Sequence, residues 1–198
     1  MTASIVRKNF FLAGNPSVGK TSLIKEIIQT CPEKFGGFYT EQILKATSIS
    51  AGGGEGGYRQ QREGFIIKTI PEGKSVLFAS KNPDGIAAKP LLRFNKYYVD
   101  LNALEKTAIP SVDRALEENK IAVIDEIGSM EILSDTFRIK IIEWLSSDSK
   151  ILATIRFNSK PFTDELKKRA DTEVIILRPD NMAFVKNLLI HRLDLNLP

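Results

Sequence analysis

Four residues near the N-terminus have types and spacing that suit phosphate chemistry. Gly14, Gly19, Lys20 and Thr21 fit the pattern G-x-x-x-x-G-K-[ST], within the stretch FFLAGNPSVGKTSLIKEII. In such loops, backbone N–H groups surround nucleoside phosphates, the lysine reaches the outer phosphates and the hydroxyl group meets magnesium. We therefore predict that a nucleoside triphosphate binds this loop, which consists of Gly14, Asn15, Pro16, Ser17, Val18, Gly19, Lys20 and Thr21.

The residues on both sides of the loop favour the same interpretation. The stretch NFFLAG is typical of a buried strand, and one helical face follows it, formed by Leu23, Ile24, Ile27 and Ile28. A strand followed by a helix is the required context, because the helix adds the positive end of its dipole to the site. A glycine-containing turn at an ordinary strand–helix junction is the alternative.

Two adjacent carboxylates form the second chemical signal. The stretch KIAVIDEIGSM is typical of a strand buried on both faces of a parallel sheet, and it ends in Asp125 and Glu126. We expect Asp125 to lie just outside the metal's own ligands, so that Thr21 and Asp125 together hold Mg²⁺. Glu126 is the predicted base that orients or deprotonates the attacking water. Lys20 and Glu126 are thus the predicted catalytic residues.

Both carboxylates reach the phosphates only if the chain bends after them. Successive strand residues point to opposite faces of a sheet, and Ile127 and Gly128 offer the bend. The alternative is that the two acids solvate a strand end, with Gly128 as a turn.

A second positive charge beside the transferred phosphoryl group has three candidates. Arg156 is slightly favoured over Arg138 and Arg62, because it follows the strand ILAT, whose end we expect at the ligand edge of the sheet. Thr154 is expected to hydrogen-bond the attacking water. A surface role is the alternative for each arginine. Aromatic stacking on the base has three candidates, although packing is the alternative for each: Phe38, Tyr39 and Tyr97.

The order of the elements predicts the fold class. Strands alternate with helices at both ends of the chain, which favours an α/β fold with a mostly parallel central sheet and helices on both faces. The glycine-rich segment 51–57 separates two β-prone runs, so an antiparallel hairpin insertion is expected near residues 42–70. A single domain spanning residues 1–198 is the default for this length.

Helix-start residues divide the second half of the chain. Pro110 is expected to begin one helix, Ser134 to cap the next and Asp180 to begin the last. The middle helix is expected to bury one apolar face, formed by Phe137, Ile141, Ile142, Trp144 and Leu145.

Composition excludes several classes of protein. Hydrophobic residues make up 42% of the chain and charged residues 26%, as in ordinary globular domains. Cys31 is the single cysteine and no long apolar span is evident, so we expect a cytoplasmic protein that does not enter a membrane. The net charge of +4 comes without a basic block, which leaves nucleic acid a minor alternative as partner. We expect a monomer.

Six stretches, in order along the chain, resemble one known family. They are GNPSVGKTSLI, GGFYTEQI, REGFII, NKYYVDL, VIDEIGSMEILSDTF and ILATI, of which DEIGSMEI is the most specific. They are similar to the THEP-type nucleoside-triphosphatases, which comprise the cancer-related nucleoside-triphosphatase and its archaeal and bacterial relatives. Asn95 departs from the family, whose members usually have glycine there, and asparagine also tolerates left-handed backbone.

The resemblance implies a fold, an activity and a set of residues. The fold is a P-loop NTPase (Rossmann-like) three-layer sandwich, and the activity is Mg²⁺-dependent hydrolysis of ATP, GTP and other nucleoside triphosphates to the diphosphate and phosphate, with broad base specificity. Glu131 and Ser134 match the family pattern without a role that the sequence supplies. The second nucleotide-binding element consists of Val123, Ile124, Asp125, Glu126, Ile127 and Gly128.

Two other functions remain alternatives. A nucleotide or small-molecule kinase shares the loop and magnesium chemistry, but its arginine-rich lid is not evident in this sequence. A nucleotide-switched protein that binds RNA or another protein is the second alternative.

Overall fold

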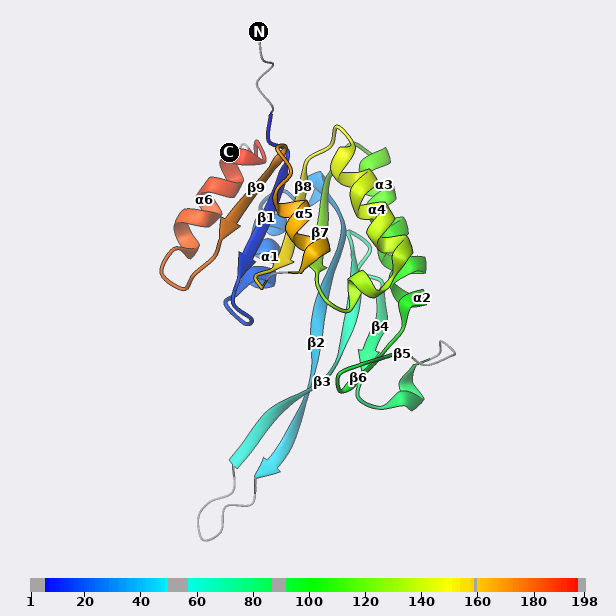
Figure 1. The fold of residues 1–198 in the computed structure, drawn as a ribbon. Coiled ribbons are helices and arrows are strands. Elements are labelled where there is room, and N and C mark those ends of the chain that lie inside the picture. Colours follow the sequence, from blue (N-terminus) through cyan, green and yellow to red (C-terminus); the bar gives the residue numbers. More distant parts are fainter. Residues whose placement is uncertain (1–5, 50–56, 87–91, 159, 196–198) are drawn as a thin grey trace.

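One nine-stranded sheet runs through the part of the chain that the computed structural model describes, residues 6–49, 57–86, 92–158 and 160–195. Its strand order is β5-β6-β4-β3-β2-β7-β8-β1-β9 (Figure 1). The strands are β1 (Asn9–Gly14), β2 (Phe35–Ile49), β3 (Gly57–Ile70), β4 (Ser75–Ser80), β5 (Leu92–Phe94), β6 (Tyr97–Val99), β7 (Ile121–Ile127), β8 (Ile151–Arg156) and β9 (Thr172–Ile176).

The sheet has a parallel half and an antiparallel half that share β2. Every neighbouring pair from β2 through β7, β8 and β1 to β9 is parallel, whereas every pair from β2 to β5 is antiparallel. All six residues of β1 are buried, as are six of the seven in β7, which is the burial expected of parallel strands covered on both faces.

Helices cover both faces of the parallel half. In β1, Phe10 and Leu12 belong to one apolar core and Phe11 to the other, because successive side chains point to opposite faces. Helices α1 (Lys20–Thr30) and α6 (Met182–Arg192) pack on the first core. Helices α3 (Ile109–Glu117), α4 (Asp135–Ser146) and α5 (Pro161–Lys167) pack on the second (Figure 1). The α/β arrangement with helices on both faces is confirmed.

The expected hairpin is formed by β2 and β3. Their pairing runs from Gly37 opposite Ile70 to Ile49 opposite Gly57, with an irregularity between Ile43 and Leu44. Only the first five residues of β2 pair with β7, so the distal hairpin projects from the body of the molecule (Figure 1). Most of the glycine-rich segment 51–57 lies outside the described residues.

The helix expected to begin at Pro110 is α3, which begins one residue earlier, at Ile109, with Pro110 in its first turn. It continues a helical path that starts further upstream. Asp100 caps it by accepting a hydrogen bond from the backbone N–H of Ala103 at 3.2 Å. The helical path then continues through α2 (Leu101–Ala103) and η3 (Leu104–Ala108) into α3. Because η3 is a π-helical turn, the chain passes Pro110 without a break in the helical path.

Two details of the later helices also differ from expectation. Ser134 caps α4 as predicted, but Ile142 is 48% exposed because it lies about 140° around the helix from Phe137. Helix α6 begins at Met182 rather than at Asp180. The preceding residue, Asn181, is bound to the turn before the helix, because its side chain accepts from the N–H of Arg178 and donates to a strand carbonyl.

Short elements complete the described chain. Asn95, in the turn between β5 and β6, has a φ of 53°, which confirms its left-handed backbone. No helix in residues 6–49, 57–86, 92–158 and 160–195 is long and apolar enough to cross a bilayer. The short turns are η1 (Pro32–Lys34), η2 (Pro83–Gly85) and η4 (Glu131–Leu133).

Candidate active site

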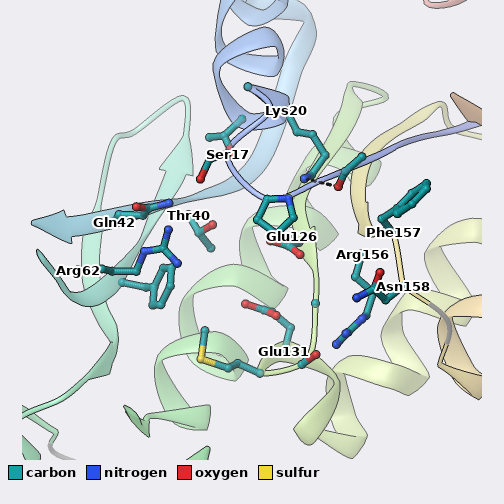
Figure 2. A pocket seen from close by; sticks show the side chains of 18 of the residues that line it. Ser17, Lys20, Thr40, Gln42, Arg62, Glu126, Glu131, Arg156, Phe157 and Asn158 are labelled. Carbon is teal, nitrogen blue, oxygen red and sulfur yellow. Dashed lines mark hydrogen bonds between the residues drawn. The ribbon is translucent and has the colours of Figure 1, made fainter. Parts of the chain in front are cut away.

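A cavity of about 450 Å³ lies at the carboxyl ends of β1, β7 and β8 and extends to the antiparallel half (Figure 2). Of the fourteen residues in the two predicted nucleotide-binding stretches, 14–21 and 123–128, eight line it: Gly14, Pro16, Ser17, Gly19, Lys20, Thr21, Glu126 and Gly128. Six do not line it: Asn15, Val18, Val123, Ile124, Asp125 and Ile127.

The loop between β1 and α1 owes its shape to backbone that turns left-handed twice. Ser17 has a φ of 63° and Gly19 a φ of 102°. Gly14 is required for packing, because a Cβ there would lie 2.6 Å from the carbonyl oxygen of Leu177. The ammonium of Lys20 closes the loop by donating hydrogen bonds to the carbonyl oxygens of Gly14, at 3.0 Å, and Asn15, at 3.1 Å.

The first turn of α1 presents free donors at the cavity. Its first helical hydrogen bond runs from the N–H of Leu23 to the carbonyl of Gly19, at 2.9 Å. The N–H groups of the first three helical residues therefore have no partner within the helix, and Lys20, Thr21 and Ser22 line the cavity. This end of the helix suits an anion.

Asp125 is joined to the loop by hydrogen bonds. The hydroxyl of Thr21 donates to its Oδ2 at 2.8 Å, and the hydroxyl of Thr154 donates to its Oδ1. Asp125 is 1% exposed, and this burial raises the pKa of its carboxyl, opposed by these hydroxyls, by the N–H of Thr40 and by the charge of Lys20. Thr154 is thus committed to Asp125, not to the cavity where we expected it to meet water.

The irregularity that separates the two carboxylates comes earlier than expected. The register of β7 against β8 shifts between Ile124 and Ile127, and Ile127 again pairs with Ile155. The shift is therefore confined to Asp125 and Glu126, whose connecting peptide is cis, so the bend expected at Ile127 and Gly128 is not where the strand departs from regularity.

Glu126 and Glu131 converge above Gly128. A Cβ at Gly128 would lie 2.6 Å from Oε2 of Glu131 and 3.1 Å from Oε1 of Glu126, so a side chain there would displace a carboxylate. Burial and the charge of Asp125 raise the pKa of Glu126, opposed by Lys20, Arg156 and Arg62. Glu131 is 4% exposed, and burial with the charge of Glu126 raises its pKa to about 8.

Two of the three candidate arginines line the cavity. Arg156 does so from the end of β8 and Arg62 from β3. Arg138 does not, because its guanidinium pairs with Asp135 at 2.7 Å and lies over the ring of Phe162.

The aromatic residues that line the cavity differ from those expected. Phe38 and Tyr97 are buried in the core, and Tyr39 lies beneath the ammonium of Lys25. The aromatic lining residues are Phe65, Phe94 and Phe157. Sequence reasoning also assigned no role at the site to six polar or sulphur-containing lining residues: Ser22, Thr40, Gln42, Ser129, Met130 and Asn158.

Comparison with known proteins places this site in a family. The profile of a family described as NTPase matches residues 9–192. Nucleoside-triphosphatase THEP1 of Thermotoga maritima is 32% identical over 185 residues, which cover 93% of this chain and 95% of the relative.

Two solved structures agree with this placement. The crystal structure of THEP1 from Aquifex aeolicus has a TM-score of 0.77 at 28% identity and covers 94% of this chain and 99% of that one. The solution structure of a human cancer-related nucleoside triphosphatase has a TM-score of 0.71 at 28% identity and covers 93% of this chain and 96% of that one. The P-loop NTPase fold and the predicted resemblance are thus confirmed, and the chain belongs to the THEP1-type NTPase family.

Proposed function

We propose that this protein hydrolyses nucleoside triphosphates to the diphosphate and phosphate, with Mg²⁺ as cofactor. One observation carries the proposal: the Thr21 hydroxyl of the phosphate loop donates to Asp125 at 2.8 Å, so the loop and the acidic end of β7 face one cavity. The relatives' names supply the class of substrate.

The residues at this junction fit magnesium. Thr21 and Asp125 offer a hydroxyl and a carboxylate, the oxygen ligands that Mg²⁺ prefers. No group of three or more His, Cys, Asp or Glu residues within the described chain could enclose a metal, and Mg²⁺ with a nucleotide commonly uses one or two protein groups plus phosphates and water. When bound, Mg²⁺ would neutralise charge on the outer phosphates.

The loop and α1 bind and orient the polyphosphate. The unpartnered N–H groups at the start of α1 donate to phosphate oxygens, and the helix end favours their charge. Lys20 already lies over the loop carbonyls, from which its ammonium turns to the outer phosphates.

Glu126 accepts the proton of the attacking water. Its carboxylate lines the cavity beside the loop (Figure 2). The water oxygen bonds to the γ-phosphorus, the bond from that phosphorus to the bridging oxygen breaks, and its electron pair leaves with the diphosphate. A raised pKa brings Glu126 closer to neutral pH, where a general base is most effective.

Broad base specificity is part of the proposal. The relatives are named for nucleoside triphosphates as a class, not for one base. The polar groups described above, from the loop, β7 and β8, face the phosphate end of a nucleotide.

A phosphate-release assay tests the proposed function. Purified protein with Mg²⁺ and ATP, GTP, CTP or UTP, without another substrate, is expected to release phosphate from each and to stop when EDTA removes the metal. Phosphate release only after an acceptor is added would favour the kinase. Nucleotide binding without turnover, with a partner that prefers one nucleotide state, would favour the switch.

A further inference from the structure

Two arginine side chains at the cavity each carry a hydrogen-bond donor that no described residue accepts. The Nε atoms of Arg62 and Arg156 are buried, and neither has a partner among residues 6–49, 57–86, 92–158 and 160–195. An unsatisfied buried donor is costly, and for a guanidinium the cost is greater because the group is always charged. Such a pair in one cavity suits an anionic ligand.

The other described arginines do not share this state. Arg138 pairs with Asp135, and Arg169 bonds both oxygens of Asp171. Arg59, on the same strand as Arg62, is exposed, so water satisfies its donors. Partial burial without an acceptor therefore separates Arg62 and Arg156 from the arginines of the surface.

The two guanidinium groups flank the general base from different halves of the sheet. Figure 2 shows Glu126 between Arg62 on one side and Arg156 on the other. Arg62 is held over the ring of Phe65, with its Cζ 5.3 Å from the ring centre, and Arg156 ends β8. Both positive charges also oppose the rise in the pKa of Glu126, which agrees with their closeness to it.

We propose that Arg62 and Arg156 form an oxyanion-binding pair that holds the γ-phosphoryl group during its transfer to water and the phosphate product afterwards. This inference rests on the proposed function, because the loop and Lys20 place the terminal phosphate beside Glu126. Charge spreads over the equatorial oxygens of the transferred group in the transition state, and two guanidinium donors on opposite sides stabilise it there.

In this proposal the hairpin formed by β2 and β3 contributes a residue to the reaction. Arg62 belongs to β3, which joins the parallel half only through β2. Arg62 thus adds to Lys20 and Arg156 a third cation of the site, supplied by an element that lies outside the phosphate loop and the acidic strand.

Binding of a transition-state analogue tests the pair. We would measure the affinity of Arg62→Ala, Arg156→Ala and the double variant for Mg·ADP with and without aluminium fluoride, which imitates the transferred phosphoryl group. Each single variant is expected to lose about 10²-fold in analogue affinity and 10²- to 10³-fold in kcat, the loss typical of one oxyanion donor. Affinity for Mg·ADP alone should hold within about threefold, because the pair faces only the phosphoryl group.

Two controls separate this role from a structural one. Arg59→Ala removes a cation from the same strand as Arg62, and Arg138→Ala removes one from α4 that pairs with Asp135 outside the cavity. Both should leave analogue affinity unchanged. Because the two Nε donors are unsatisfied, Arg62→Ala and Arg156→Ala should melt at the wild-type temperature or above it. Arg62→Lys and Arg156→Lys should recover only part of the affinity, since lysine lacks the guanidinium fork.

The outcomes distinguish this inference from the proposed function. Suppose that the wild type hydrolyses triphosphates but that Arg62→Ala or Arg156→Ala binds the analogue as tightly as the wild type does. This result would overturn the arginine pair and leave the proposed hydrolysis intact. Wild-type protein that binds the analogue through both arginines but releases no phosphate would support the pair as a binding site for the phosphoryl group and would overturn hydrolysis.

Discussion

The parallel and antiparallel halves of the sheet contribute to the cavity in different ways. In the parallel half, residues at or near the carboxyl ends of the strands supply the loop, Glu126 and Arg156, and Asp125 accepts from the loop residue Thr21. In the antiparallel half, Gln42, Arg62 and other lining residues come from within strands. Parallel strands end together at one edge, so their ends gather charged groups around a ligand. Lining residues within the antiparallel strands instead form one side of the cavity, which we call the wall: Gln42, Arg62, Phe65 and Phe94.

This difference predicts where substitutions act. Changes at the strand ends of the parallel half should affect turnover most, because charged groups there touch the phosphates and the water. Changes in the wall should act weakly unless they remove a charge. The following predictions test this comparison.

Lys20→Ala is expected to have the largest effect. Loss of its ammonium removes charge-assisted hydrogen bonds to the outer phosphates, so triphosphate affinity should fall roughly tenfold to a hundredfold and phosphate release should become undetectable. Calorimetric titration and a phosphate assay measure the two effects.

Lys25→Ala is the matched control for Lys20→Ala. Lys25 lies one helical turn later in α1, where it pairs with Glu41 and covers Tyr39 outside the cavity. Its turnover should be close to wild type. Equal losses in both variants would mean that α1 acts through its overall charge and not through contact with the phosphates.

Glu126→Gln is expected to retain Mg·ATP binding and to lower kcat by about 10² to 10⁴, the range for a lost general base. In the wild type, kcat should rise with pH as Glu126 ionises, with a midpoint above the ordinary glutamate value because its pKa is raised. The variant should lose this ascending limb. A wild-type rate in Glu126→Gln would remove the assignment.

The same contrast explains which parts of the site the sequence could predict. Two parts of the site are continuous in sequence, Gly14 to Thr21 and Val123 to Gly128. The first is built by one strand–loop–helix unit and the second by the end of one strand. Their types and spacing therefore appear as motifs. The strand alternation likewise predicted the α/β fold, and Asn95 its left-handed turn.

The wall could not be read in this way. Gln42, Arg62 and Phe94 come together through antiparallel pairing across five strands, from β2 to β5, and pairing register leaves no local signal. Arg62 was less favoured than Arg156 from the sequence and could not be told apart from Arg138, which the structure pairs with Asp135 outside the cavity. Glu131 follows the acidic strand by a few residues, but its convergence with Glu126 depends on the absence of a side chain at Gly128.

Glu131→Gln is expected to change stability more than binding. The folded-state pKa of about 8 lies above the unfolded value of 4.5, so between these two pH values Glu131 is protonated in the folded protein and ionised in the unfolded chain. Stability is therefore lost as pH rises through this range. The free energy of unfolding of the wild type should therefore fall by on the order of 3 kcal/mol between pH 5 and pH 8. The variant should not show this fall.

Urea unfolding at both pH values measures this difference. Glu117→Gln, an exposed substitution on α3, is the control and should follow the wild type. A pH dependence in Glu131→Gln equal to that of the wild type would show that Glu131 is ionised in the folded protein.

Phe94→Ala is expected to have the smallest effect and tests the wall directly. Phe94 lies on β5, a three-residue edge strand, and its half-buried ring lines the cavity without carrying charge. Because this ring stabilises the transition state no better than the ground state, kcat should stay within about threefold of wild type, under 1 kcal/mol of barrier. Leu92→Ala, on the same strand but outside the cavity, controls for loss of packing at the sheet edge. A hundredfold loss in Phe94→Ala alone would show that the reacting phosphate lies against the antiparallel wall, and the division of labour between the two halves would then be wrong.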